Sequence, residues 1–199
     1  MSEDEILDSA VGALDQGRIV VIPTDTVYGL AARPDSTEAV QKIFELKGRP
    51  PDKALSVLGP DINTLKMVAE MEDRALALAG RYWPGPLTLV VGRRHGFTHD
   101  LGGGEADSIA VRVPASETAR ALLVRTGPLA VTSANRSGDS PANSVDGARE
   151  VFGDAVSVYI DGGRAGKGVA STVVSLLGEP LVLREGPISE DEIRQTLTS

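Results

Sequence analysis

Cysteine is absent from the 199-residue chain, and aromatic residues make up only 4% of it. The lack of cysteine excludes disulfides, thiolate zinc ligands and cysteine nucleophiles. No apolar run approaches the roughly 20 residues of a membrane-spanning helix. Residues 1–5 are acidic, whereas the start of a secretory signal is basic. We therefore expect a cytoplasmic protein whose core is built mainly from aliphatic side chains.

Positive charge is also scarce, with 20 Lys and Arg against 28 Asp and Glu and a net charge of −8. Proteins that hold nucleic acid by general electrostatics use Lys and Arg to neutralise phosphates. The balance therefore counts against a general nucleic-acid binder, although it leaves room for a local cationic pocket. Because we find no repeat, linker or break in composition, we predict a single domain over residues 1–199.

The hydrophobic pattern alternates between helical and strand periodicity along the chain. This pattern predicts an α/β fold with a twisted mixed sheet and flanking helices, and the short spacing of the last strands predicts some antiparallel pairs. The expected helices cover 3–16, 36–46, 61–69, 72–82, 116–125, 144–151 and 189–197. The expected strands cover 18–22, 87–91, 108–113, 129–132, 156–160, 171–177 and 181–184.

Two motifs point to chemistry that their context does not support. Residues 161–168 resemble a phosphate-binding loop, but the segment begins with Asp161, ends with Gly168 and precedes a strand rather than a helix. We interpret it as a connector. His95 and His99 have the spacing of two zinc ligands on a helix, but the glycine between them disfavours a helix. We expect both to be solvated loop residues.

Two cations follow the expected helix 36–46. Lys47 and Arg49 are separated by one glycine and are followed by two prolines. A compact ammonium and a planar guanidinium at this spacing could bind adjacent phosphates. The alternative is a pair of cations that stabilise the helix C-terminus through its dipole.

Small polar residues stand at the ends of other elements. Ser133 and Asn135 follow the expected strand 129–132, where they could bind phosphate oxygens or a base edge, or form a turn. Residues 23–26 form either a hydroxyl cluster or a helix cap. Trp83, next to a Pro-Gly-Pro turn, is most simply a packing anchor.

No single motif is decisive, but the order of seven motifs is. Together they make the sequence resemble the YrdC/TsaC family of threonylcarbamoyl-adenylate synthases of tRNA modification, over about residues 6–186. The resemblance implies a twisted α/β sheet around a large concave cavity and a short, single-domain form. The motifs are Pro-Thr-Asp-Thr-Val-Tyr-Gly-Leu (23–30), Lys-Gly-Arg-Pro (47–50), Trp-Pro-Gly-Pro-Leu-Thr (83–88), Ala-Val-Arg-Val-Pro (110–114), Thr-Ser-Ala-Asn-Arg-Ser-Gly (132–138), Ser-Thr-Val-Val (171–174) and Leu-Arg-Glu-Gly (183–186).

The resemblance implies a reaction that joins L-threonine, bicarbonate or CO2, and ATP into threonylcarbamoyl-AMP with release of pyrophosphate. Mg²⁺ would arrive with ATP rather than bind protein side chains, and other enzymes would transfer the threonylcarbamoyl group to tRNA. Two alternatives share the fold. One is a non-catalytic module that binds double-stranded RNA or the ribosome, and the other is the carbamoyl-transfer domain of hydrogenase maturation. The acidic charge disfavours the first alternative, and the missing cysteine-rich zinc modules disfavour the second.

The matching motifs also imply the site residues. Catalysis would depend on Lys47 and Arg49. The expected ATP contacts are Lys47, Arg49, Lys53, Ser108, Ser133, Asn135, Asn143 and Arg184, and the expected threonine contacts are Thr26, Arg112 and Ser171. Two positions depart from the family pattern. Lys53 stands where many members have Asn, and Leu58 stands where many have His near the threonine.

Overall fold

The computed structural model describes residues 2–103, 107–166 and 168–198. Its α-helices are α1 (Glu3–Asp15), α2 (Thr37–Lys47), α3 (Ile62–Leu65), α4 (Asp73–Tyr82), α5 (Glu117–Thr126), α6 (Val145–Phe152) and α7 (Glu190–Thr198), with a 3-10 turn η1 (Gly153–Ala155). Its strands are β1 (Val20–Ile22), β2 (Gly29–Ala32), β3 (Ser56–Leu58), β4 (Leu87–Gly92), β5 (Ser108–Arg112), β6 (Leu129–Ser133), β7 (Val158–Tyr159), β8 (Thr172–Ser175) and β9 (Leu181–Arg184).

In the described part of the chain, these strands form one mixed sheet in the order β7-β1-β2-β6-β3-β5-β4-β8-β9. The pairs β1–β7, β3–β5 and β4–β8 are parallel, and the other neighbours are antiparallel. The expected α/β fold with a mixed sheet is confirmed, and so is the antiparallel pairing of the last two strands.

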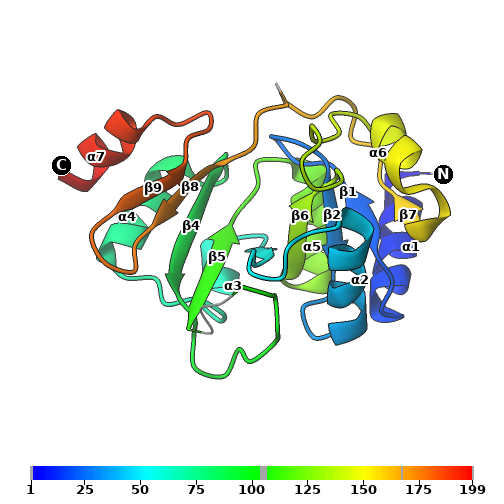
Figure 1. Cartoon of the computed structure of the whole chain (residues 1–199), viewed down its shortest axis with the longest axis horizontal. Coiled ribbons are helices and arrows are strands. Elements are labelled where there is room, and N and C mark those ends of the chain that lie inside the picture. Colours follow the sequence, from blue (N-terminus) through cyan, green and yellow to red (C-terminus); the bar gives the residue numbers. More distant parts are fainter. Residues whose placement is uncertain (1, 104–106, 167, 199) are drawn as a thin grey trace.

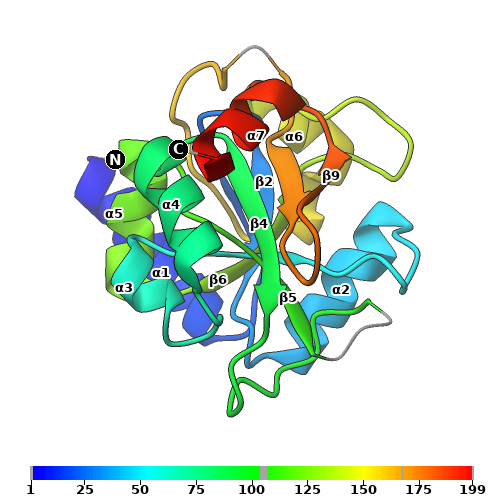
Figure 2. The same ribbon diagram turned by 90° about the vertical axis from the view of Figure 1, so that its left-hand side faces the viewer.

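Helices cover both faces of the sheet because side chains on successive strand residues point to opposite faces. On β1, Val20 and Ile22 pack into the core formed with α1 and α5, while Val21 packs into the larger core that includes α2 and α4. Figure 1 shows β4, β5, β8 and β9 grouped with α4 and α7, and β1, β2, β6 and β7 grouped with α1, α2, α5 and α6. The view in Figure 2, turned by 90°, also places α7 beside α4, with which it packs.

The helix ends follow from local capping. Ser2 and Glu5 form a reciprocal capping box at the start of α1, and the Ser36 hydroxyl accepts from the backbone N–H of Ala39 at the start of α2. After α2, Gly48 adopts a left-handed conformation with φ 59°, which glycine tolerates best. Because of this turn, the side chains of Lys47 and Arg49 point in different directions.

The sequence did not indicate the two interior strands β2 and β3. The residues of β2 are Gly, Leu, Ala and Ala, which lack the β-branched side chains typical of strands, yet all four are buried between β1 and β6. Tertiary burial, rather than local propensity, makes this segment a strand. Several expected elements are shorter in the structure, since helix 61–69 is reduced to α3 and strand 156–160 to β7.

Among the described residues, no helix is both long enough and apolar enough to cross a membrane. The cytoplasmic location and the extent of the single domain stay predictions.

Candidate active site

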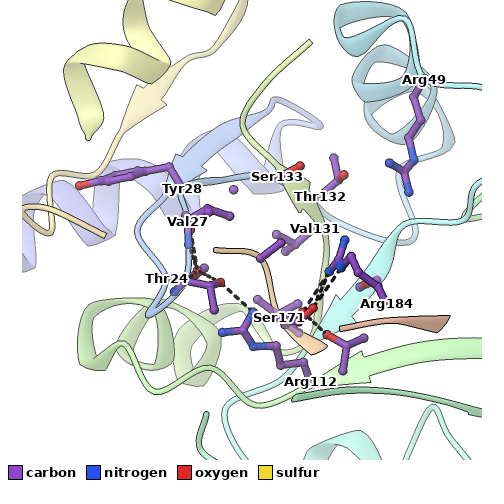
Figure 3. Close-up of a pocket in the computed structure, with 16 residues that line it drawn as sticks. Thr24, Val27, Tyr28, Arg49, Arg112, Val131, Thr132, Ser133, Ser171 and Arg184 are labelled. Carbon is purple, nitrogen blue, oxygen red and sulfur yellow. Dashed lines mark hydrogen bonds between the residues drawn. The ribbon is translucent and has the colours of Figure 1, made fainter. Parts of the chain in front are cut away.

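A cavity opens on one face of the sheet, across the neighbouring strands β2, β6, β3 and β5. Strand register brings its residues together, because Gly29 pairs with Ser133 and Leu58 pairs with Arg112. The cavity is open to solvent and contains about 620 Å³ of space, its mouth included. Its lining is Thr24, Thr26, Val27, Tyr28, Gly29, Arg49, Ser56, Leu58, Thr88, Arg112, Val131, Thr132, Ser133, Ala170, Ser171 and Arg184 (Figure 3).

Arg112 lies at one end of the cavity and is held by two segments, the turn between β1 and β2 and the turn before β4. Its Nη2 donates to Asp25 Oδ1 at 2.6 Å, its Nη1 donates to Thr26 Oγ1 at 3.0 Å, and its Nε donates to the carbonyl of Gly85 at 2.9 Å. Burial lowers the pKa of Arg112, and the neighbouring Asp25 opposes this shift. An arginine side chain remains charged under such conditions. The end of β5 therefore presents a fixed guanidinium that suits a carboxylate ligand.

Ser171 comes from the segment just before β8 and lies beside Arg112 and Arg184 (Figure 3). Its hydroxyl is 2.8 Å from the Thr88 hydroxyl on β4. Arg184, at the end of β9, donates from both Nε and Nη2 to the Ser171 carbonyl, at 3.0 and 2.9 Å. The last antiparallel pair of strands thus positions both residues in the cavity.

Arg49 reaches the cavity from the turn after α2. Its Nε donates to the carbonyl of Lys53 and its Nη2 to the carbonyl of Ala54, at 2.8 and 2.9 Å. Partial burial lowers the pKa of Arg49, and the like charge of Arg184 lowers it further. Two guanidinium groups that repel each other across a cavity are suited to binding a polyanion between them.

Lys47 lies behind this surface rather than on it. Its side chain is buried, and its ammonium donates to the carbonyls of Ser133 and Asn135, at 2.6 and 2.7 Å, and to Asn135 Oδ1 at 3.2 Å. The Asn135 Oδ1 also accepts from the Ser133 hydroxyl at 2.6 Å. The structure therefore joins Lys47, Ser133 and Asn135 in one network, and Ser133 and Arg49 both line the cavity.

The structure places the eleven predicted contacts at different distances from the cavity. Arg49, Ser133, Arg184, Thr26, Arg112 and Ser171 line it, whereas Lys47 and Asn135 support the lining from behind. Their roles toward ATP and threonine stay predictions. The three remaining residues, Lys53, Ser108 and Asn143, are not among the lining residues.

Each of these three has a distinct location. Lys53 is exposed, and its carbonyl holds Arg49. Ser108 is on the same face of β5 as Arg112 but four residues away, about 13 Å along the strand. The Asn143 carbonyl accepts from the backbone N–H of Ala165 at 2.9 Å. Leu58, the departure from the family pattern, does line the cavity, next to Arg112 in the strand register.

The sequence interpretation missed several contributors to the site. Residues 23–26 form a hydroxyl cluster in the turn between β1 and β2 rather than a helix cap, and Thr24 lines the cavity along with Thr26. Trp83 does pack on the core, as predicted, but its turn also supplies the Gly85 carbonyl that holds Arg112. Asp25 also belongs to the site, because it holds Arg112. Its position between Thr24 and Thr26 in the sequence is the only signal that could have indicated this.

The segment 161–168 is not a free connector where the structure describes it. The Tyr28 hydroxyl donates to the carbonyl of Gly163 at 2.6 Å and accepts from the backbone N–H of Gly162. In Figure 3 the Tyr28 ring points away from the cavity, toward this segment. A Cβ at Gly166 would lie 2.4 Å from the carbonyl oxygen of Asp25, so the segment packs closely against the 23–28 turn. Lys167, part of the loop-like motif, lies outside the described residues.

The two histidines lie in the non-helical segment between β4 and β5, as expected. His95 is exposed, and the His99 ring packs edge-on against Phe97 with ring centroids 5.0 Å apart.

These features define an α/β protein whose sheet carries an open small-molecule site with three arginines and a ring of hydroxyl groups. The Sua5/YciO/YrdC family model, described as "Telomere recombination", matches residues 12–186. The chain belongs to this family, which confirms the resemblance inferred from the motifs.

Individual relatives agree over nearly the whole chain. A Mycobacterium tuberculosis relative is 41% identical over 95% of this chain and 88% of its own length. An Idiomarina loihiensis protein named threonylcarbamoyl-AMP synthase is 38% identical over 85% of this chain and 92% of its own. The crystal structure of Pyrococcus abyssi Sua5 complexed with L-threonine has a TM-score of 0.91 and 39% identity, and covers 98% of this chain and 58% of that longer chain.

Proposed function

We propose that this protein is an L-threonylcarbamoyladenylate synthase, which forms threonylcarbamoyl-AMP and pyrophosphate from L-threonine, bicarbonate or CO2, and ATP. The observation that supports this function is the division of one cavity into two kinds of site. Arg112, Thr26 and Ser171 gather at one end, where an amino acid could bind. Arg49, Arg184 and Ser133 offer cations and a hydroxyl for a triphosphate. The names of the relatives support the same substrates.

The proposed chemistry needs no covalent bond to the protein. The amine of threonine attacks CO2 and loses a proton, giving a carbamate. A carbamate oxygen then attacks the α-phosphorus of ATP, the bond between this phosphorus and the bridging oxygen breaks, and pyrophosphate leaves with that oxygen. The enzyme is accordingly a nucleotidyltransferase. Its residues contribute by holding two reactants in line and by balancing the charge that develops on the phosphates.

Mg²⁺ belongs to this proposal as part of the nucleotide substrate, because it is carried by the ATP phosphates. When bound, it neutralises phosphate charge and helps pyrophosphate leave. Arg49 and Arg184 supply the protein's own positive charge in the cavity. We further propose that the product is consumed by enzymes that transfer the threonylcarbamoyl group to tRNA.

Pyrophosphate release from ATP tests the function directly. We expect release only when threonine, bicarbonate and MgATP are all present, and loss of release when any one is omitted. Release that continues without threonine would point to an ordinary ATP pyrophosphatase and would contradict the proposal.

A further inference from the structure

We propose that Asp25 is a positioning residue of the amino-acid site, which orients Arg112 and reserves it for a zwitterion. This inference rests on the proposed function. Asp25 does not line the cavity, and its carboxylate acts through the guanidinium that does.

The Asp25–Arg112 ion pair is the most enclosed of the ion pairs described in the structure. The side chains of Arg112 and Asp25 are 6% and 17% exposed, whereas at least one partner of each other described pair is half-exposed or more. The same Asp25 Oδ1 accepts from the backbone N–H of Ala115 at 2.9 Å. One carboxylate oxygen therefore ties the turn between β1 and β2 to the segment after β5.

This attachment limits what Arg112 can offer a ligand. Bonds to Asp25, Thr26 and Gly85 use one N–H on each of its three nitrogens. A guanidinium has five N–H groups, so within the described residues one remains on each terminal nitrogen. Donors on these two adjacent nitrogens can bind the two oxygens of a carboxylate.

The neighbouring Thr26 is oriented in the same way. The Thr24 hydroxyl donates its single proton to the Val27 carbonyl at 2.5 Å. The Thr26 hydroxyl lies 3.0 Å from the Thr24 hydroxyl, whose oxygen also accepts from the backbone N–H groups of Thr26 and Val27. Thr26 Oγ1 accepts from Arg112 Nη1, and its second lone pair can accept from a substrate. An acceptor beside two donors fits the amine and carboxylate of an α-amino acid.

The charge of Asp25 also separates the two ends of the cavity. At the Arg112 end the carboxylate balances the guanidinium, which favours a ligand of zero net charge. Arg49 and Arg184 repel each other, which favours a polyanion such as a triphosphate between them, and Arg184 also repels Arg112. Without the Asp25 charge, Arg112 becomes a third free cation and a site for phosphate.

Calorimetry with Asp25→Asn tests this role. The amide keeps an oxygen that can accept from Ala115 and Arg112, but it removes the charge. We expect threonine affinity to fall about 10- to 100-fold, as for loss of a charge-assisted bond. ATP affinity should be unchanged, and inorganic phosphate should become a competitor of threonine. Asp25→Glu retains the charge, so phosphate should not compete with threonine in this variant. It provides a second measurement if Asp25→Asn folds poorly.

The matched control is Asp35→Asn, which breaks the exposed Arg33–Asp35 pair and should leave both affinities unchanged. Unchanged threonine affinity in Asp25→Asn would overturn the proposal, and so would equal losses of threonine and ATP binding, which indicate a merely structural role. The wild-type assay separates the two proposals. If the wild type releases no threonine-dependent pyrophosphate, the proposed function fails, whatever Asp25 does.

Discussion

Burial of the Lys47 side chain lowers the pKa of its ammonium group. Removal from water lowers its pKa from 10.5 to about 8, and the nearby charge of Arg49 contributes to the shift. The ammonium that holds the Ser133 and Asn135 carbonyls is therefore fully protonated only well below pH 8, and the neutral amine predominates above it. Since kcat/KM reports groups of the free enzyme, we expect kcat/KM for ATP to fall as the pH rises through about 8.

Steady-state rates between neutral and alkaline pH check this expectation. Lys47→Arg keeps a cation that does not titrate in this range, so its profile should lose the step. An identical step in the wild type and in Lys47→Arg would show that another group is responsible.

The hydroxyl groups around Arg112 predict the choice of amino acid. Valine has nearly the shape of threonine but lacks its hydroxyl. In a site built to bind a hydroxyl group, the missing partner leaves polar groups unpaired, which can reduce kcat/KM by about 10⁴–10⁵. Serine keeps the hydroxyl and loses one methyl, worth about 1–3 kcal/mol. We expect the order threonine, serine, valine in amino-acid-dependent pyrophosphate release. Equal rates for valine and threonine would mean that the pocket selects by shape alone.

At the scale of elements, the close approach of two segments near Ser171 carries a further prediction. A Cβ at Gly186 would lie 2.5 Å from the Ala170 carbonyl oxygen and 2.5 Å from the Thr172 nitrogen. Both atoms are backbone, so Gly186→Ala must displace the segment that carries Ser171. We expect a higher KM for threonine and a lower Tm.

Gly178→Ala is the matched control, because Gly178 lies in the turn between β8 and β9, eight residues before Gly186, and a Cβ there meets nothing within 4 Å. The two variants can be compared by thermal unfolding and by threonine kinetics. If Gly186→Ala behaves like Gly178→Ala in both, the segment is not as constrained as the structure indicates.

The helices and the strands other than β2 and β3 could be predicted from the sequence, because caps and hydrophobic periodicity are local signals. Ser36 and Gly48, for example, define both ends of α2. The strands β2 and β3 could not, because Gly29–Ala32 is strand only through its neighbours on both sides and Ser56–Leu58 is too short to show alternation. Pairing partners that lie far apart in the chain supply what local propensity lacks.

In the candidate site, too, local motifs could be predicted from the sequence, whereas contacts between distant segments could not. Motif order identified Thr26, Arg112, Ser171, Arg49, Ser133 and Arg184, which the structure places around one cavity. The orientation of Lys47 could not be predicted, since it depends on the turn at Gly48 and on carbonyls 86 and 88 residues further along the chain. The role of Asp25 depends on contacts with Arg112 and Ala115, 87 and 90 residues away.

For the whole molecule, the net charge of −8 predicts weak binding to RNA. Any contact must come from a local patch, and added salt should remove it because phosphate contacts are exchanged for counterions. Titration of the protein into labelled duplex RNA at low and high salt measures this. Tight binding that persists at high salt would favour the alternative of a non-catalytic RNA-binding module.

Mass spectrometry of the reaction product tests the central claim most directly. The protein is incubated with MgATP, L-threonine and ¹³C-labelled bicarbonate, and the nucleotide product is analysed before it hydrolyses. The account predicts threonylcarbamoyl-AMP, heavier by one ¹³C than the product from ordinary bicarbonate, in equal amount to the pyrophosphate released. AMP or ADP alone, or an adenylate that carries no carbon from bicarbonate, would contradict it.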